Sequence, residues 1–184
     1  TGAVKVTPGH DPADYARVLD EMKRADGAVG DDLRRELAVK AYAHTSRYDA
    51  AITAYLGGHT GFPGLLTLQF EKIEDLRYGE NPHQRAAAYR AAARSGASVA
   101  HAKTLGGKEL SYNNLLDLDS AFELVREFER PTCVIVKHNN PCGASTGKEA
   151  SDAFRGALEG DPVSAYGGIV AFNVPLDRET AELM

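Results

Sequence analysis

Apolar residues recur at helical spacing in the first third of the chain. Asp11-Pro12-Ala13-Asp14 is typical of a helix start, because an acidic N-cap precedes a proline at the first helical position. A second helix is predicted from Asp31-Asp32 to Gly57-Gly58. Its apolar stripe, at spacings of three and four, comprises Leu33, Leu37, Ala41, His44, Tyr48, Ile52 and Tyr55. The place of His44 on this stripe favours a buried structural histidine over a ligand.

The rest of the chain alternates between short strands and helices, which indicates the α/β class. Residues 57–70 contain four glycines and a proline, so a domain boundary is predicted there. A helix is predicted over 114–128, with Leu115, Leu118, Phe122 and Val125 on one face. The β-branched run 132–136 predicts a buried strand. Together with a helix near 149–159 and a strand near 168–172 it predicts one βαβ unit with a right-handed crossover.

The predicted strand 132–136 leads directly into Lys137-His138-Asn139-Asn140-Pro141-Cys142-Gly143. A lysine, a histidine and two amides leave the strand end together, and Asn-Asn-Pro predicts a turn. In open α/β sheets, ligands bind in the crevice outside the carboxyl ends of the strands. Each residue alone would be read as a solvated turn residue, but their adjacency favours a site for a polar substrate.

Three further motifs pair hydrogen-bonding side chains with proline or glycine. They are Arg77-Tyr78-Gly79-Glu80-Asn81-Pro82-His83-Gln84, Ser111-Tyr112-Asn113-Asn114, and Asp161-Pro162-Val163-Ser164-Ala165-Tyr166-Gly167-Gly168. An arginine offers a planar fork that suits phosphate, and adjacent glycines let a backbone approach a ligand closely. Each motif alone could be an ordinary loop, whereas the four together are specific.

Composition excludes several classes of protein. A hydrophobic content of 43% is enough for a packed core, and a net charge of −5 argues against general nucleic-acid binding. The two cysteines imply no disulfide framework, so the cytoplasm is the expected location. The first residues lack the pattern of a signal peptide, and no apolar run approaches membrane length. The strand-like Val4-Lys5-Val6-Thr7 at the start and the helix predicted to begin at 177–184 suggest an internal piece of a longer protein.

The four motifs together resemble the bifunctional purine-biosynthesis enzymes that combine 5-aminoimidazole-4-carboxamide ribonucleotide (AICAR) formyltransferase with IMP cyclohydrolase. By this resemblance, residues 1–56 are the end of the cyclohydrolase domain, 57–70 a linker, and 71–184 the start of the transformylase domain. The implied fold is the C-terminal part of a methylglyoxal-synthase-like domain, followed by the first part of a cytidine-deaminase-like domain. The family also implies a homodimer whose active sites are shared between subunits.

The resemblance implies roles for individual residues. Lys137 and His138 match the catalytic pair, and no metal is expected at the catalytic site. The positions that match substrate-binding residues are Arg77, Tyr78, Asn113, Asn114, Ser164, Tyr166, Gly167 and Gly168. The co-substrate would be 10-formyltetrahydrofolate, and the nucleotides would be AICAR, formyl-AICAR and IMP.

The implied chemistry suits these residue types. The 5-amino group of AICAR is a poor nucleophile, so a base must take its proton as the bond to the formyl group forms. Histidine, which titrates near ~6.5 when unperturbed, can do this at neutral pH. A lysine can stabilise the oxyanion of the tetrahedral intermediate or protonate the leaving N10 of the folate. An amide such as Asn114 could fix the carboxamide of the substrate.

Two other functions remain open from the residues. One is a non-catalytic nucleotide-binding or dimerisation module. The other is a zinc nucleoside deaminase, whose H-x-E and P-C-x-x-C signature is superficially similar to His138 with Pro141-Cys142. This match fails because position 140 is Asn rather than Glu and position 145 is Ser rather than Cys. The 184-residue chain alone is expected to be inactive, since the family's cyclohydrolase residues and later transformylase residues lie outside it.

Overall fold

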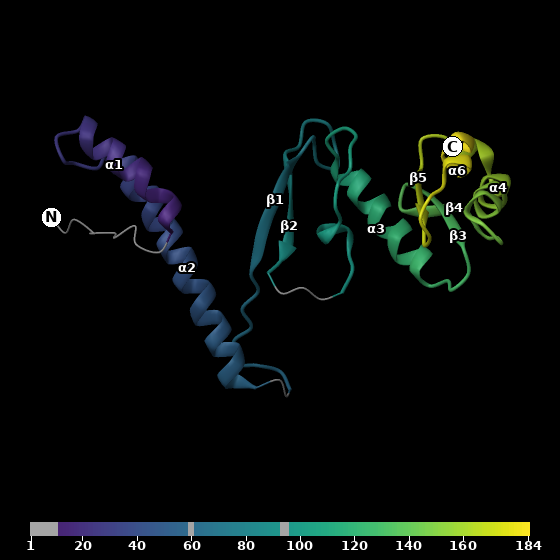
Figure 1. Cartoon of the computed structure of the whole chain (residues 1–184). Coiled ribbons are helices and arrows are strands. Elements are labelled where there is room, and N and C mark those ends of the chain that lie inside the picture. The colour runs from purple at the N-terminus through teal and green to yellow at the C-terminus, as the bar shows by residue number, and fades with distance from the viewer. Residues whose placement is uncertain (1–10, 59–60, 93–95) are drawn as a thin grey trace. The chain divides into compact units, whose positions relative to one another are not determined.

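The computed structural model describes residues 11–58, 61–92 and 96–184, and these fall into two units, Thr1–Gln69 and Phe70–Met184. In the first unit, η1 (Pro12–Asp14) leads into α1 (Tyr15–Arg24), followed by α2 (Asp31–Gly57) (Figure 1). The Asp11 carboxylate accepts a hydrogen bond from the Ala13 N–H at 3.0 Å, which caps the first turn. Gly58, at φ +70°, follows the last residue of α2. The predicted strand at Val4–Thr7 lies outside the described residues.

Ion pairs tie η1, its N-cap and α1 to the first half of α2. Arg17 pairs with Glu36, and the Lys40 Nζ lies 2.5 Å from Asp11 Oδ2 and 2.7 Å from Asp14 Oδ2. Leu33 and Leu37 are buried in this half, with 3% and 4% of their surface exposed. Two of the seven predicted stripe positions are therefore buried.

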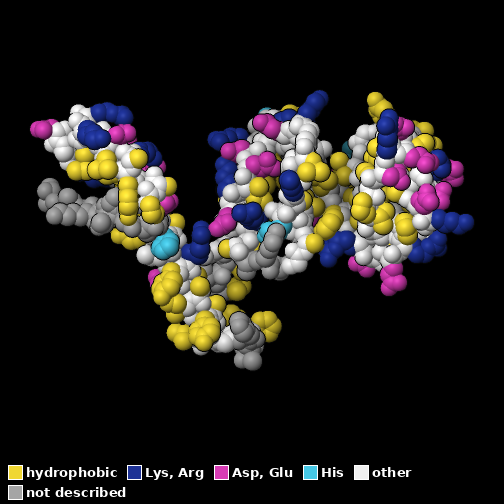
Figure 2. All heavy atoms as spheres, in the orientation of Figure 1, with side chains coloured by type: hydrophobic (Ala, Val, Ile, Leu, Met, Phe, Trp, Pro, Cys, Tyr) yellow, Lys and Arg dark blue, Asp and Glu magenta, His cyan; other side chains and the backbone are white. Residues whose placement is uncertain are grey.

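The second half of α2 is exposed. From Tyr42 to Gly58 every side chain is exposed except the half-buried Ala50, and Tyr55 is 81% exposed. Figure 2 shows hydrophobic side chains along this helix. The prediction that His44 is buried is therefore wrong, because the described residues of the unit cover α2 only as far as Ala41. Within the described residues, no helix is both long and apolar enough to cross a membrane.

The second unit begins with an antiparallel hairpin of β1 (Phe70–Leu76) and β2 (Ala86–Ala91). After η2 (Val99–His101) comes α3 (Tyr112–Arg126), which starts two residues earlier than predicted. The reason is a capping box, in which Ser111 and Asn114 exchange hydrogen bonds between side chain and backbone. Propensity alone could not distinguish Tyr112 from Asn114 as the start of this helix.

A second sheet carries the polar motif. Its strand order is β4 (Asn140–Thr146), β3 (Thr132–Lys137), β5 (Ile169–Phe172), and β3 runs antiparallel to both neighbours. Between β4 and β5 lie α4 (Ala150–Gly160) and α5 (Pro162–Ala165), and α6 (Arg178–Leu183) follows β5. The predicted elements near 132–136, 149–159 and 168–172 are confirmed, as is a mixed α/β composition.

The predicted βαβ unit starting at 132–136 is wrong, because a hairpin reverses the chain directly after Lys137. Strands β4 and β5 are parallel to each other, since both are antiparallel to β3, so the helical crossover links β4 to β5. Residues 140–146 gave no strand signal because they contain Pro and Gly. Pro141 is tolerated because β4 is an edge strand and the pairing is irregular between Ile135 and Val136.

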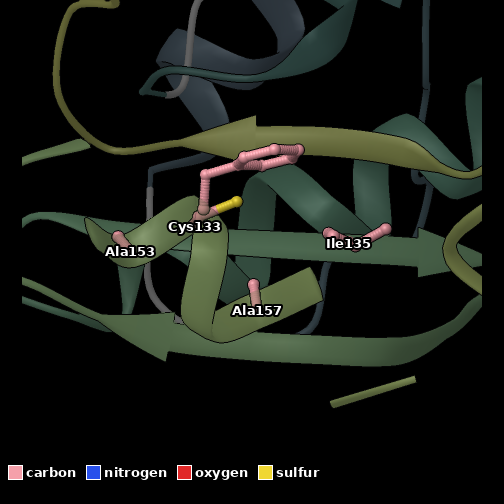
Figure 3. Packing of buried hydrophobic residues seen from close by; sticks show 5 residues of the cluster. Cys133, Ile135, Ala153 and Ala157 are labelled. Carbon is pink, nitrogen blue, oxygen red and sulfur yellow. The ribbon is translucent and has the colours of Figure 1, made fainter. Parts of the chain in front are cut away.

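Alternation along β3 divides the core between two helices. Val134 and Val136 cluster with Ala121 and Val125 of α3. Cys133 and Ile135 cluster with Ala153, Phe154 and Ala157 of α4, as Figure 3 shows from close by. A strand buried on both faces explains the continuous apolar run in the sequence.

The two cysteines are expected to differ sharply in reactivity. Burial of Cys133 raises the pKa of its thiol to about 12, so the reactive thiolate is nearly absent at pH 8. Cys142 is only half-buried, and its Sγ lies 3.4 Å from the Ile135 carbonyl oxygen. We predict that iodoacetamide modifies Cys142 in the native protein, and Cys133 only after denaturation. Peptide mapping by mass spectrometry measures both, and rapid native labelling of Cys133 would contradict its place in the core.

Candidate active site

Lys137 and His138 lie at a tight hairpin turn between β3 and β4. Lys137 pairs with Asn140 in the strand register, so His138 and Asn139 are the two loop residues. Both have left-handed backbone, at φ +55° and +63°. Positive φ at both central residues is typical of the type I′ turns that match the twist of a hairpin. His138 is exposed at this turn.

Helix α3 holds the turn from the side. The Asn139 N–H donates to Asp117 Oδ1 at 2.6 Å, and the Ser120 hydroxyl donates to Asn139 Oδ1. Within the turn, the Asn140 side-chain amide donates to the His138 carbonyl at 3.0 Å. Sequence reasoning missed Asp117 and Ser120. The available signal was their spacing of one helical turn outside the apolar face of α3.

The loop around α5 holds the side chain of Lys137. The Lys137 Nζ donates to the Tyr166 carbonyl at 2.8 Å, while the Tyr166 side chain is 86% exposed. Asp161 Oδ1 caps α5 by accepting from the Ser164 N–H at 3.0 Å. Hydrogen bonds from the Ser164 hydroxyl and N–H hold the pKa of Asp161 below its usual range, and the charge of Lys137 adds to this. The predicted residues Ser164 and Tyr166 therefore lie in a loop that contacts Lys137.

Gly167 and Gly168 meet two different steric demands in this loop. Gly167 has φ +76°, which favours glycine. At Gly168 a Cβ would come within 3.0 Å of the Val136 carbonyl oxygen, so the loop packs closely against β3. The two glycines therefore set the path of the loop beside Lys137.

Arg77 and Tyr78 follow β1 and contact the residues just before α3. The Arg77 N–H donates to the Leu110 carbonyl at 2.8 Å, and the Tyr112 N–H donates to the Tyr78 carbonyl at 3.0 Å. The Arg77 guanidinium lies over the Tyr78 ring, 4.8 Å from its centroid, and donates to its hydroxyl at 3.1 Å. Hydrogen bonds from Arg77 and Ser111, together with the positive charge of Arg77, lower the pKa of Tyr78. These surroundings suit an anionic ligand.

The two asparagines at the start of α3 have different contacts. The Asn113 side-chain amide donates to the Glu80 carbonyl at 3.2 Å, which ties α3 to the 77–84 loop. The Asn114 Oδ1 accepts from the Ser111 N–H at 3.1 Å and from its hydroxyl at 2.9 Å. Because this oxygen caps the helix, the Nδ2 of Asn114 is the side-chain atom that would contact a ligand.

One polar stripe of α3 brings the motifs together. Asn113, Asp117 and Ser120 are four and three residues apart, so they share a face of the helix. At a rise of about 1.5 Å per residue, the outer two lie about 10 Å apart along the axis. The 77–84 loop contacts one end of this stripe and the 138–139 turn contacts the other.

An open hollow of about 1200 Å³ lies over a different face of α3. It is mainly apolar, and its lining includes Leu76, Tyr89, Leu115 and Phe122, with His101 among the polar residues. Lys137 and His138 do not line it. The candidate active site is therefore on the polar stripe rather than in this hollow. Within the described part of the chain, no three His, Cys, Asp or Glu side chains are grouped so that they could hold a metal ion.

A lysine and a histidine at a left-handed turn contact one end of the polar stripe of α3, and the loop that carries an arginine contacts the other end, which makes this face a candidate site for a small polar anion. A family model described as the AICARFT/IMPCHase bienzyme matches residues 3–184. Over 180 residues the chain is 55% identical to the bifunctional purine biosynthesis protein PurH of Acidithiobacillus ferrooxidans, covering 95% of this chain and 34% of that protein. The chain belongs to the AICARFT/IMPCHase bienzyme family, as its motifs predicted, and spans about a third of the length of this curated relative.

Proposed function

We propose that this chain supplies part of the formyl-transfer site of an enzyme of de novo purine biosynthesis, which transfers a formyl group from 10-formyltetrahydrofolate to AICAR. The carrying observation is the turn that presents Lys137 and His138 on the same face of α3 as the 77–84 loop. In the intact enzyme the product, formyl-AICAR, would cyclise to IMP. Residues 1–56 would belong to the cyclohydrolase domain and 71–184 to the transformylase domain.

The proposed reaction begins when the 5-amino nitrogen of AICAR attacks the formyl carbon. His138 takes the amine proton as the carbon–nitrogen bond forms, because the neutral amine would otherwise become an ammonium. The formyl oxygen carries negative charge in the intermediate, and the ammonium of Lys137 stabilises it. When the bond to N10 breaks, Lys137 donates a proton to N10. The contact from Nζ to the Tyr166 carbonyl supports this role, since it fixes the ammonium near the turn.

Arg77 and Tyr78 are proposed to bind the phosphate of the nucleotide, with Asn113 and Asn114 at the start of α3 beside them. The folate, and a second subunit that completes the site in a homodimer, belong to the same proposal. The cytoplasmic location also remains a prediction.

The direct test is an assay of the intact protein with AICAR and 10-formyltetrahydrofolate, in which tetrahydrofolate and IMP are both measured. Turnover that depends on both substrates supports the proposal. Tight AICAR binding without turnover would instead support the non-catalytic nucleotide-binding module. Stoichiometric zinc by elemental analysis, with release of ammonia from a nucleoside, would favour the deaminase.

Replacing Arg77 by alanine is expected to raise the KM for AICAR by roughly 10–100-fold, the equivalent of one lost charged hydrogen bond. The kcat should change by only a few-fold, since a phosphate contact is common to the ground and transition states. Steady-state kinetics with varied AICAR measure both constants.

Two control variants separate this role from others. Arg90 on β2 pairs with Glu71 at 3.5 Å, so Arg90→Ala removes an arginine of the same unit and should leave KM unchanged. Tyr78→Phe keeps the ring under the guanidinium but removes the hydroxyl to which Arg77 donates. It therefore tests whether Arg77 acts only by holding the hydroxyl of Tyr78. A large loss of kcat at unchanged KM in Arg77→Ala would contradict the phosphate role.

A further inference from the structure

The turn that carries His138 adopts a backbone that is costly for any residue other than glycine. Both His138 and Asn139 are left-handed, at φ +55° and +63°. A side chain makes this region unfavourable, although histidine and asparagine enter it more often than most residues. Type I′ turns prefer glycine at the second central position, and here that position is Asn139. Contacts from outside the turn must therefore favour this conformation over an open one.

Helix α3 provides those contacts from two residues one turn apart. Asp117 accepts the main-chain N–H of Asn139 at 2.6 Å, and Ser120 donates its hydroxyl to the Asn139 side chain. A carboxylate that accepts an N–H makes a charge-assisted hydrogen bond, which is stronger than a neutral one. The first bond holds the backbone and the second holds the side chain, so together they fix Asn139 against the helix.

The other side of His138 is also fixed. Lys137 is the last residue of β3, and this strand is the buried centre of its sheet. The backbone of His138 is thus held between the strand and the contacts of Asn139. The same stripe of α3 binds the 77–84 loop through Asn113, so one helix aligns both motifs.

We propose that Asp117 and Ser120 are positioning residues for formyl transfer. They hold the 138–139 turn in its left-handed conformation and so set the place from which His138 takes the amine proton. The inference rests on the proposed function, in which His138 is the base. A misplacement of a reacting group by about 1 Å can lower a rate about 100-fold, so these contacts are expected to act on kcat.

The first test compares Asp117→Ala with Asp117→Asn in the intact enzyme. The alanine variant is expected to lose roughly 10–100-fold in kcat for formyl transfer, with the KM for AICAR unchanged. The asparagine variant keeps an Oδ1 acceptor and should stay within a few-fold of the wild type. Asp119→Ala removes an exposed carboxylate from the same helix and is the matched control. A wild-type kcat in Asp117→Ala would overturn the proposal.

The second test is rescue by glycine. Asn139→Gly makes the turn favourable by itself, because glycine adopts positive φ without a Cβ penalty. The double variant Asp117→Ala/Asn139→Gly should therefore recover most of the lost kcat. If Asp117 served only to fold α3, a change in the turn would restore nothing, and that outcome would overturn the proposal. If Asp117→Ala does not fold, Ser120→Ala with and without Asn139→Gly repeats the test under the same two criteria.

A third comparison separates this inference from the proposed function. His138→Ala is expected to be slow, and Asp117→Ala/His138→Ala should be no slower, because Asp117 acts through His138. A fully active His138→Ala would refute the role of the base, and the positioning role with it. A slow His138→Ala beside a fully active Asp117→Ala would refute the positioning role alone.

Discussion

Replacing Lys137 or His138 by alanine in the intact enzyme is expected to lower the kcat for formyl transfer by roughly 10²–10⁴-fold. General base catalysis by a positioned histidine and stabilisation of an oxyanion by a fixed cation each contribute about this much. The two side chains are adjacent at one turn, and each has a separate support, in the α5 loop for Lys137 and in α3 for the turn. Steady-state and single-turnover kinetics with saturating substrates measure the loss.

Two controls show whether such a loss is local. The cyclisation of formyl-AICAR, which the proposed function places in the other domain, should continue in both variants. Lys148→Ala and His44→Ala remove an exposed lysine and an exposed histidine elsewhere and should leave formyl transfer unchanged. A near-normal rate in Lys137→Ala or His138→Ala would remove that residue from the mechanism.

The helices and the central strand could be predicted because their signals are local. Asp11-Pro12 marks the start of the first helical segment, Gly58 marks the end of α2, and an apolar run marks β3. Each of these signals depends on neighbouring residues alone. The pairing of β3 with β4 depends instead on whether a two-residue loop closes at His138. Residues 140–146 contain Pro and Gly, so neither propensity nor alternation marks them as a strand.

The motifs of the candidate site were found from the sequence, but the way they meet was not. The prediction that a strand end delivers Lys137 and His138 assumed the edge of a parallel sheet, whereas they lie at an antiparallel hairpin. Asp117 is 22 residues from its partner Asn139. Only the packing of α3 against β3 brings them together, and no local sequence pattern predicts a contact between residues so far apart in the chain.

The burial of α2 was overestimated for a related reason. A stripe at helical spacing shows which face of a helix is apolar, but not how far along the helix a partner extends. Leu33 and Leu37 are buried where the first turn and α1 are tied to α2, and His44 lies beyond that part. Periodicity alone therefore predicts which face of a helix is buried better than it predicts how much of the helix is buried.

Gly143→Ala is expected to destabilise the second unit by about 3 kcal/mol or more, because it forces a methyl group into a closed space. A Cβ at Gly143 would lie 1.9 Å from the Ala157 carbonyl oxygen and 2.8 Å from its carbon. These are backbone atoms of α4, so no side-chain rotation can relieve the clash. The helix cannot move away freely, since Ala153, Phe154 and Ala157 pack in the core around Cys133 and Ile135.

A loss of this size is a large share of the roughly 5–15 kcal/mol that stabilises a typical domain. Urea unfolding of the intact protein, followed by circular dichroism, should show a lower midpoint for Gly143→Ala. Gly106→Ala is the matched control in the same unit, because nothing lies within 4 Å of a Cβ there and its φ is not in the left-handed range. That variant should be neutral or slightly stabilising, since alanine restricts the unfolded chain.

Equal midpoints for Gly143→Ala and the wild type would mean that α4 does not pack this closely on β4. Because β4 is also the second strand of the hairpin that carries Lys137 and His138, formyl transfer should fall as α4 separates from the sheet.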